Sequence, residues 1–224
     1  DYGPDDVATP AVLNALKKAG VPATFFVVGS AALKSPNLLR RMVDEGHLVG
    51  SHTFLHPHLE RIQPWQINLE LNATQKLIAG QTGRNTRLFR LPYIRGSGPM
   101  TAQEASLFPS LEAEGYVVAG SDIVPPDWSG LKAEGIIDYT MKGLTQGHGN
   151  IILLHDGRSE GMHTVAAIPL LIARLQAEGY EIVSLAELMG SSTEVLMPFA
   201  AKTSAVFSSL SFGTISTVLQ MLFV

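Results

Sequence analysis

The chain has 224 residues, of which 46% are hydrophobic, so we expect one large domain or two small ones with a sizeable core. A formal charge of -4 and the lack of any Lys/Arg cluster argue against a nucleic-acid-binding surface. Because the chain has no cysteine, disulfide bonds, thiolate metal sites and a cysteine nucleophile are excluded.

Helix-like and strand-like segments alternate along the chain. Thr9 as an N-cap predicts a helix that ends at Gly20, and Pro36 opens a second helix that ends at Gly46. Further helices are predicted at residues 64–80, 164–177 and 185–189, with a kink at Pro169. Short apolar runs predict strands at residues 23–28, 47–50, 88–89, 116–119, 151–154 and 182–184.

Glycine recurs where a predicted helix turns into a predicted strand. It does so at Gly20, Gly46, Gly115 and Gly179, where it can supply a left-handed C-terminal cap. Helices that return to strands through short turns indicate βα units and a parallel sheet. About six or seven such units favour a barrel over an open, doubly wound sheet. No Gly-x-Gly-x-x-Gly or Walker loop is present, which argues against a nucleotide-binding fold.

Polar residues follow the ends of successive predicted strands. They form five groups: Asp1 to Pro4, Ser51 to His56, Arg90 to Tyr93, Asp122 with Asp127 and Trp128, and His155 with Asp156. Chemistry in barrels lies at the carboxyl ends of the strands, so their joint placement predicts a site. Each group alone also has a structural explanation, such as a capping aspartate, a salt-bridged arginine or a tryptophan at the edge of the core.

Two histidines stand four residues apart in the second group. If residues 51–56 form a helical turn, His52 and His56 lie on one face and can point at the same place. Neutral imidazole is a common zinc ligand, so this spacing is compatible with a metal site. Two surface histidines are the alternative that the spacing leaves open.

In this order the five groups resemble the motifs of the NodB-like polysaccharide deacetylases, which are metal-dependent carbohydrate esterases. Arg90 to Tyr93 resembles the family's Arg-x-Pro-Tyr motif, and Ile152 to Asp156 resembles its Leu-x-x-His motif. The resemblance covers roughly residues 1–190. The stretches Glu70 to Leu77 and Val195 to Pro198 look most like the subgroup that is fused to a membrane glycosyltransferase.

The resemblance implies a role for each matching residue. His52 and His56 would hold a divalent metal, with Zn²⁺ preferred and Co²⁺ or Ni²⁺ as alternatives. Asp1 would be the general base, Arg90 would orient it, His155 would be the general acid, and Asp127 would hold His155. For the substrate, the resemblance implies that the backbone N–H of Tyr93 binds the oxyanion, and that Trp128 and Leu153 line the groove for the acetyl methyl group.

The chain departs from the family pattern at Tyr2, which aligns with the aspartate that binds the metal. A neutral phenol is a poor zinc ligand beside a carboxylate. Either Asp1 is the metal ligand and Tyr2 is an insertion, or Tyr2 is a substitution and Asp1 or water completes the shell, or the domain binds without catalysing. Leu91 in place of the usual proline is a milder change, and the spacing from Asp122 to Asp127 is longer than expected. We expect His47 and His58 to be surface residues.

The resemblance also implies the architecture. We predict an α/β fold, a distorted (β/α)7-type barrel whose first strand is missing from this chain. Residues 1–190 would form the deacetylase domain, and residues 191–224 a linker and an apolar tail. Because no charge follows Lys202, residues 203–224 are a candidate for the start of a transmembrane helix, an interfacial helix or a disordered segment.

The expected activity follows from the resemblance. It is the metal-dependent removal of N-acetyl groups from a β-linked N-acetylglucosamine-type polysaccharide, at the extracytoplasmic face of the membrane or at the cell surface. The expected partner is therefore the acetylated polysaccharide, with membrane attachment and covalent fusion to a glycosyltransferase. The alternatives are an inactive carbohydrate-binding or scaffold domain beside a glycosyltransferase, which Tyr2 suggests, and an amide hydrolase that acts on small cyclic ureides.

Overall fold

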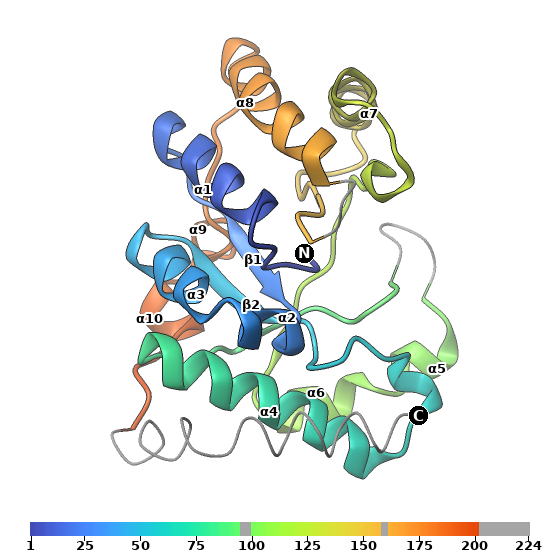
Figure 1. The fold of residues 1–224 in the computed structure, drawn as a ribbon. Helices are drawn as coiled ribbons and strands as arrows, with labels where there is room; N and C mark the ends of the chain where they lie inside the picture. The colour runs from blue at the N-terminus through green and yellow to red at the C-terminus, as the bar shows by residue number, and fades with distance from the viewer. Residues whose placement is uncertain (95–99, 158–160, 202–224) are drawn as a thin grey trace.

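The structure, a computed structural model, describes residues 1–94, 100–157 and 161–201, and it has the predicted α/β fold with a parallel sheet (Figure 1). The sheet has four strands in the order β1-β2-β3-β4. Their bounds are Thr24–Val27, Leu48–Ser51, Leu88–Phe89 and Val117–Val118. In the register of the first pair, Thr24 lies beside Leu48 and Val27 beside Ser51. All carboxyl ends therefore meet at one edge of the sheet, as a βα fold requires.

Helices surround this sheet. They are α1 (Ala8–Ala19), α2 (Gly29–Lys34), α3 (Pro36–Asp44), α4 (Pro64–Thr82), α5 (Ala102–Ala105), α6 (Phe108–Ala113), α7 (Ala133–Thr145), α8 (Gly161–Ala177), α9 (Leu185–Leu188) and α10 (Thr193–Leu196). In Figure 1, α8 lies between α1 and α7, and it contacts both. Helix α4 runs below the sheet and contacts α2, α3 and β2.

The start of α1 differs from the prediction. The helix begins at Ala8, and Thr9 lies buried in its first turn instead of capping it. The cap comes from Asp5, whose Oδ1 accepts the N–H groups of Val7 and Ala8 at 2.8 Å each. The Thr9 hydroxyl instead donates to Asp156 at 2.6 Å. Thr9 therefore joins α1 to the segment that carries His155.

The barrel is not closed. Two predicted strands, residues 151–154 and 182–184, form no regular strand, and residues 151–154 contribute only one parallel bridge, between Ile152 and Ile123. A strand needs a hydrogen-bonded neighbour along its length, and within the described residues β1 is paired with β2 alone. A hollow of about 590 Å³ adjoins β1, with Phe25, Leu154 and Ile182 among the residues of its wall. The unpaired side of β1 thus faces this hollow.

Residues 1–3 bridge the rim of the hollow. The backbone N of Asp1 donates to the carbonyl of Leu154 at 2.6 Å, and its carbonyl accepts the N–H of Asp156 at 3.2 Å. Gly3 accepts the N–H of Val28 at 3.0 Å. The residues around Asp1 are therefore held between the end of β1 and the segment that carries His155.

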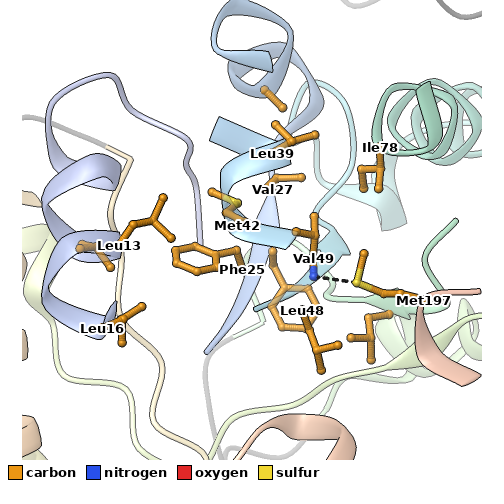
Figure 2. Close-up of a cluster of buried hydrophobic side chains, with 14 of the residues drawn as sticks. Leu13, Leu16, Phe25, Val27, Leu39, Met42, Leu48, Val49, Ile78 and Met197 are labelled. Atoms are coloured by element: carbon orange, nitrogen blue, oxygen red, sulfur yellow. Dashed lines mark hydrogen bonds between the residues drawn. The ribbon is translucent and has the colours of Figure 1, made fainter. Parts of the chain in front are cut away.

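The main core lies between α1, α3, α4 and the first two strands, as Figure 2 shows. Its buried side chains include Leu13, Leu16, Phe25, Val27, Leu39, Met42, Leu48, Val49, Ile78 and Met197. Burying each such side chain contributes about 1.5–3 kcal/mol relative to exposure. This core fixes the strands, and with them the loops at their carboxyl ends.

The packed unit runs past the predicted boundary at residue 190. Leu196 and Met197 are buried in the main core, and the Met197 sulfur accepts the N–H of Val49 at 3.1 Å (Figure 2). The carbonyl of Leu196 accepts the N–H of Arg87 at 2.8 Å, and Ala200 donates to Gly83 at 2.9 Å. Residues up to Ala200 therefore belong to the same folded body.

The prediction for the end of the chain stays untested. The apolar tail at residues 203–224 lies outside the described residues. Among the helices that the structure describes, none has the length and apolar character needed to cross a bilayer.

Candidate functional site

A cup of about 560 Å³ opens at the carboxyl ends of the strands. All nine residues that were given a role from the sequence line it: Asp1, His52, His56, Arg90, Tyr93, Asp127, Trp128, Leu153 and His155. Tyr2, His58, Leu91, Ile94 and Val124 complete the lining. His52 directly follows β2 and Arg90 directly follows β3, so the parallel sheet brings them to one place. Their shared location is established, whereas their individual roles remain predictions.

Asp1 is the centre of the charge network. Its side chain is only 3% exposed, and its Oδ2 accepts from Arg90 Nε at 3.2 Å. The same oxygen lies 3.5 Å from His52 Nε2, while Oδ1 lies 3.0 Å from His155 Nε2. One carboxylate thus faces a guanidinium and two imidazoles.

Arg90 is held by its own partners. Its guanidinium donates to the Ser121 hydroxyl at 2.9 Å and to the Ala119 carbonyl at 3.3 Å. Burial lowers the pKa of Arg90 to about 10, so the guanidinium is still charged at neutral pH. A fixed positive charge beside Asp1 favours the ionised carboxylate, which is the form a general base needs.

His155 and Asp127 form a buried pair. His155 Nδ1 lies 2.7 Å from Asp127 Oδ1, and the other carboxylate oxygen accepts the His155 backbone N–H at 2.7 Å. The Thr164 hydroxyl donates to that second oxygen at 2.8 Å. Burial alone would raise the pKa of Asp127, but the hydrogen bonds and charge of His155 outweigh burial and lower it. Burial lowers the pKa of His155, and the hydrogen bond to Asp127 opposes this.

Thr164 was not predicted as a site residue. It lies on α8, far along the chain from Asp127, and a single threonine in an apolar helix carries no sequence signal for such a contact. Its hydroxyl completes the set of donors around Asp127, so this carboxylate is fully held before any substrate binds.

The two histidines of the predicted metal site face each other. His52 Nε2 and His56 Nε2 are 3.1 Å apart. His52 Nδ1 lies 2.9 Å from the Arg90 carbonyl, so it carries the proton and leaves Nε2 as a bare lone pair. Burial lowers the pKa of His52 to about 3, which keeps the ring neutral, as metal binding requires.

The two histidines fit two corners of a metal site, but within the described residues no carboxylate completes it as a third ligand. Two nitrogens bound at about 2.0–2.1 Å to a tetrahedral metal lie roughly 3.3 Å apart, close to the spacing of His52 and His56. Yet no group of three or more His, Cys, Asp or Glu side chains in the described part of the chain is arranged to hold a metal. The phenol oxygen of Tyr2, the residue expected to stand in place of a carboxylate ligand, lies 3.3 Å from His56 Nδ1.

Aromatic side chains form the mouth of the cup. Tyr93 is 48% exposed, and its ring stacks on His58 with centroids 3.8 Å apart and an angle of 8°. Trp128 is 41% exposed and meets the His155 ring edge-on at 5.0 Å. Flat, half-exposed rings of this kind suit the apolar face of a sugar or an acetyl methyl group. His58 is therefore not simply a surface residue, because it supports Tyr93 within the lining.

The prediction that His47 lies on the surface is wrong. His47 directly precedes β2, and its side chain is 3% exposed and packs edge-on against Phe25 of β1. Its Nδ1 accepts the N–H of Ala23 at 3.2 Å. His47 does not line the cup and serves the packing of the first two strands.

The backbone of the cup is unusual. Four residues other than glycine have positive φ in the described chain, namely Tyr2 (75°), Thr53 (66°), His56 (61°) and Tyr93 (63°). Three of them line the cup, and Thr53 lies between its two histidines. Each such residue costs about 1–3 kcal/mol, a cost that proteins sustain mainly at functional sites. This independent signal marks the same place as the side chains.

Two aspartates near the motifs do not line the cup. Asp122 Oδ2 accepts the N–H groups of Asn150 and Ile151 at 2.9 and 2.8 Å, so it caps the turn that leads to His155. Asp156 is buried and accepts from Thr9, as described above. Both residues position the backbone around the site.

Comparisons with known proteins agree with this geometry. Residues 1–107 match a family model described as polysaccharide deacetylase. The chain is 34% identical over 200 residues to a chitooligosaccharide deacetylase of Bradyrhizobium sp. (strain ANU 289), covering 84% of this chain and 87% of that relative. It is 32% identical over 205 residues to the peptidoglycan-N-acetylglucosamine deacetylase PgdA of Listeria monocytogenes. That match covers 92% of this chain but 41% of the relative, so the chain spans less than half the length of PgdA.

A solved structure extends the likeness to the fold. The family 4 carbohydrate esterase from Streptomyces lividans, in complex with acetate, superimposes with a TM-score of 0.69 at 31% identity. The superposition covers 90% of this chain and 94% of the esterase chain.

Proposed function

Because the chain belongs to the polysaccharide deacetylase family, we propose that it is a metal-dependent hydrolase that removes N-acetyl groups from a β-linked N-acetylglucosamine polysaccharide. The observation that carries the proposal is the position of His155, 3.0 Å from Asp1 and 2.7 Å from Asp127 in a cup that also holds two facing imidazoles. The printed names of relatives, which include chitooligosaccharide and peptidoglycan deacetylases, support this substrate class. For such a polymer we propose a location at the cell surface or on the extracytoplasmic face of the membrane.

His52 and His56 would hold the metal, with Zn²⁺ as the first choice and Co²⁺ or Ni²⁺ as alternatives. When bound, such an ion supplies a Lewis acid for the acetyl carbonyl oxygen and for the attacking water. The hydrogen bond from His52 Nδ1 to the Arg90 carbonyl orients its ring for this task.

The residues of the chain move the protons. Asp1, kept ionised by Arg90, accepts a proton from the attacking water while the oxygen of that water bonds to the acetyl carbon. His155 then gives its Nε2 proton to the amide nitrogen as the C–N bond breaks, which releases acetate and a free amine. Asp127 stabilises the imidazolium through Nδ1. In this scheme the Tyr93 backbone N–H binds the oxyanion, and Trp128 and Leu153 receive the methyl group.

Acetate release tests the proposal. The chain is incubated with chito-oligosaccharides, with and without added Zn²⁺ or Co²⁺, and free acetate is measured. We expect metal-stimulated release that His155→Ala abolishes and that His163→Ala leaves unchanged, because His163 is an exposed histidine on α8 outside the cup. Absence of acetate with every metal would sink the proposal.

Tyr2 favours one second candidate. A phenol where the family has a carboxylate ligand fits an inactive carbohydrate-binding or scaffold domain, in this proposal attached to a membrane glycosyltransferase. Calorimetry with zinc chloride separates the two candidates. Zinc binding at micromolar or tighter affinity that is lost in His52→Ala excludes the purely structural version, whereas polymer binding without zinc binding or acetate release favours it.

A further inference from the structure

The turn that carries the two histidines does not follow from its own sequence. Thr53 and His56 both have left-handed backbone, which residues with a side chain rarely adopt. In this backbone conformation the Nε2 atoms of His52 and His56 lie 3.1 Å apart. Something outside the turn must therefore hold it.

Helix α4 provides such a contact through Glu70. The Glu70 side chain is 0% exposed, and its Oε2 accepts the N–H groups of Phe54 at 2.6 Å and of Leu55 at 2.8 Å. Both N–H groups lie between His52 and His56 in the chain. A single buried oxygen on α4 therefore binds the middle of the turn.

Other contacts fix the remaining polar groups of the turn. Helix α2 donates from Gly29 to the Thr53 carbonyl at 2.9 Å and from Ser30 to the Phe54 carbonyl at 2.8 Å. The Thr53 hydroxyl accepts the N–H of His56 at 3.0 Å. Among these contacts, the N–H groups in the middle of the turn are bound by a side chain from another element, and that side chain is Glu70.

We propose that Glu70 is a positioning residue, whose carboxylate oxygen fixes the turn so that the imidazoles of His52 and His56 stay directed at one point. The role requires a hydrogen-bond acceptor at Oε2. The inference deepens the proposed function, and it depends on the metal only where zinc is used as the probe.

Burial disfavours the negative charge of Glu70. Burial raises the pKa of Glu70, against the opposing effect of the Leu55 and Phe54 N–H groups, so the neutral acid is favoured relative to an exposed glutamate. The second oxygen, Oε1, is buried and makes no hydrogen bond within the described structure. A neutral glutamine, whose amide oxygen can replace Oε2, should therefore preserve the turn, whereas methionine of similar length should not.

Zinc calorimetry on three variants of the whole chain tests the role. Glu70→Met should lower the affinity for zinc chloride by about 10- to 100-fold, the usual effect of losing a residue that orients metal ligands. Glu70→Gln should keep the affinity of the unchanged chain, and so should Lys76→Met, a control at an exposed position of the same helix. Circular dichroism at the same temperature shows that each variant is folded.

Two calorimetric outcomes would overturn the role of Glu70. One is a folded Glu70→Met variant with unchanged zinc affinity. The other is a Glu70→Gln variant that loses as much affinity as Glu70→Met, since an acceptor would then not be sufficient.

Amide hydrogen exchange gives a second readout that needs no metal. In Glu70→Met the amides of Phe54 and Leu55 should exchange faster, while those of the core residues Leu77 and Ile78 keep their protection. Unchanged exchange at Phe54 and Leu55 would also overturn the role. A chain that binds zinc and shows the expected exchange but releases no acetate would contradict the proposed function and leave the role of Glu70 intact.

Discussion

Asp127→Asn tests how the buried aspartate tunes His155. The carboxylate accepts the His155 Nδ1 proton at 2.7 Å, and its side chain is fully buried. Hydrogen bonds to a charged group contribute about 1.5–3 kcal/mol, and they are roughly twice as strong as neutral ones. If the asparagine oxygen takes the same place, about half of that energy is lost from the charged form of His155. At 1.36 kcal/mol per unit, the pKa of His155 should fall by about 0.5–1 unit.

The sign follows from which form is favoured. Asp127 stabilises the protonated imidazole, so its neutralisation makes His155 lose its proton at lower pH. NMR titration of the His155 side-chain nitrogens measures this shift directly. The alkaline limb of the kcat/KM profile should move to lower pH by the same amount, because His155 must be protonated to act as the acid.

Thr164→Val is the matched control. It removes only the 2.8 Å hydrogen bond to Asp127 and leaves the carboxylate charged, so the pKa of His155 should stay or rise slightly. A folded Asp127→Asn variant in which the pKa of His155 is unchanged or higher would refute the reasoning.

Three further predictions concern stability and metal affinity. Met197→Ala should lower the free energy of unfolding in urea titrations by about 2–5 kcal/mol, because Met197 is fully buried. Val195→Ala, at a half-exposed position, should change it little. Equal effects of the two substitutions would contradict the packing of this segment. Burial lowers the pKa of His47, so the stability it contributes is complete above about pH 6.5 and declines as the pH falls, by up to roughly 1.4 kcal/mol per pH unit. His47→Asn keeps an acceptor for Ala23 and should weaken that acid dependence, and an unaltered slope in denaturation at pH 5 to 7 would count against it. Tyr2→Asp adds a carboxylate ligand, so it should raise the affinity for zinc in calorimetry. The gain should exceed about 10- to 100-fold, which is the effect of a residue that only orients a ligand. No gain would show that Tyr2 is not at the ligand position.

Much of the fold could be predicted because its boundaries have local causes. Gly20 ends α1 with φ of 67°, and Pro64 opens α4 at the first position of that helix, as the sequence indicated. The strands at residues 151–154 and 182–184 could not be judged locally. Their apolar runs are strand-like, but a strand forms only with neighbours, and these lie far apart in the chain.

The candidate site divides in the same way. Asp1, Arg90 and His155 could be predicted because parallel strands carry motif residues to one edge of the sheet. Thr164 and Glu70 could not, because each acts through one hydrogen-bonding atom that only the packing of a helix brings to the site. Buried polar residues within helices are ambiguous from sequence alone, and their partners decide what they do.

The left-handed backbone of the cup also limits how this protein can be made to withstand heat. Selection for thermostable variants favours substitutions that relax strained backbone, and glycine at His56 or Tyr93 would be such a substitution. At these two positions the stabilising substitution would remove the imidazole of His56 or the Tyr93 ring at the mouth of the cup. Improvement is better sought at wall residues of the hollow beside β1 that do not line the cup, such as Phe25, Ile168 and Ile182, where larger apolar side chains can fill space. The two cavities share Asp1, Arg90, Leu153 and His155, so stability can be raised without altering the site only at wall residues of the hollow that lie outside the cup.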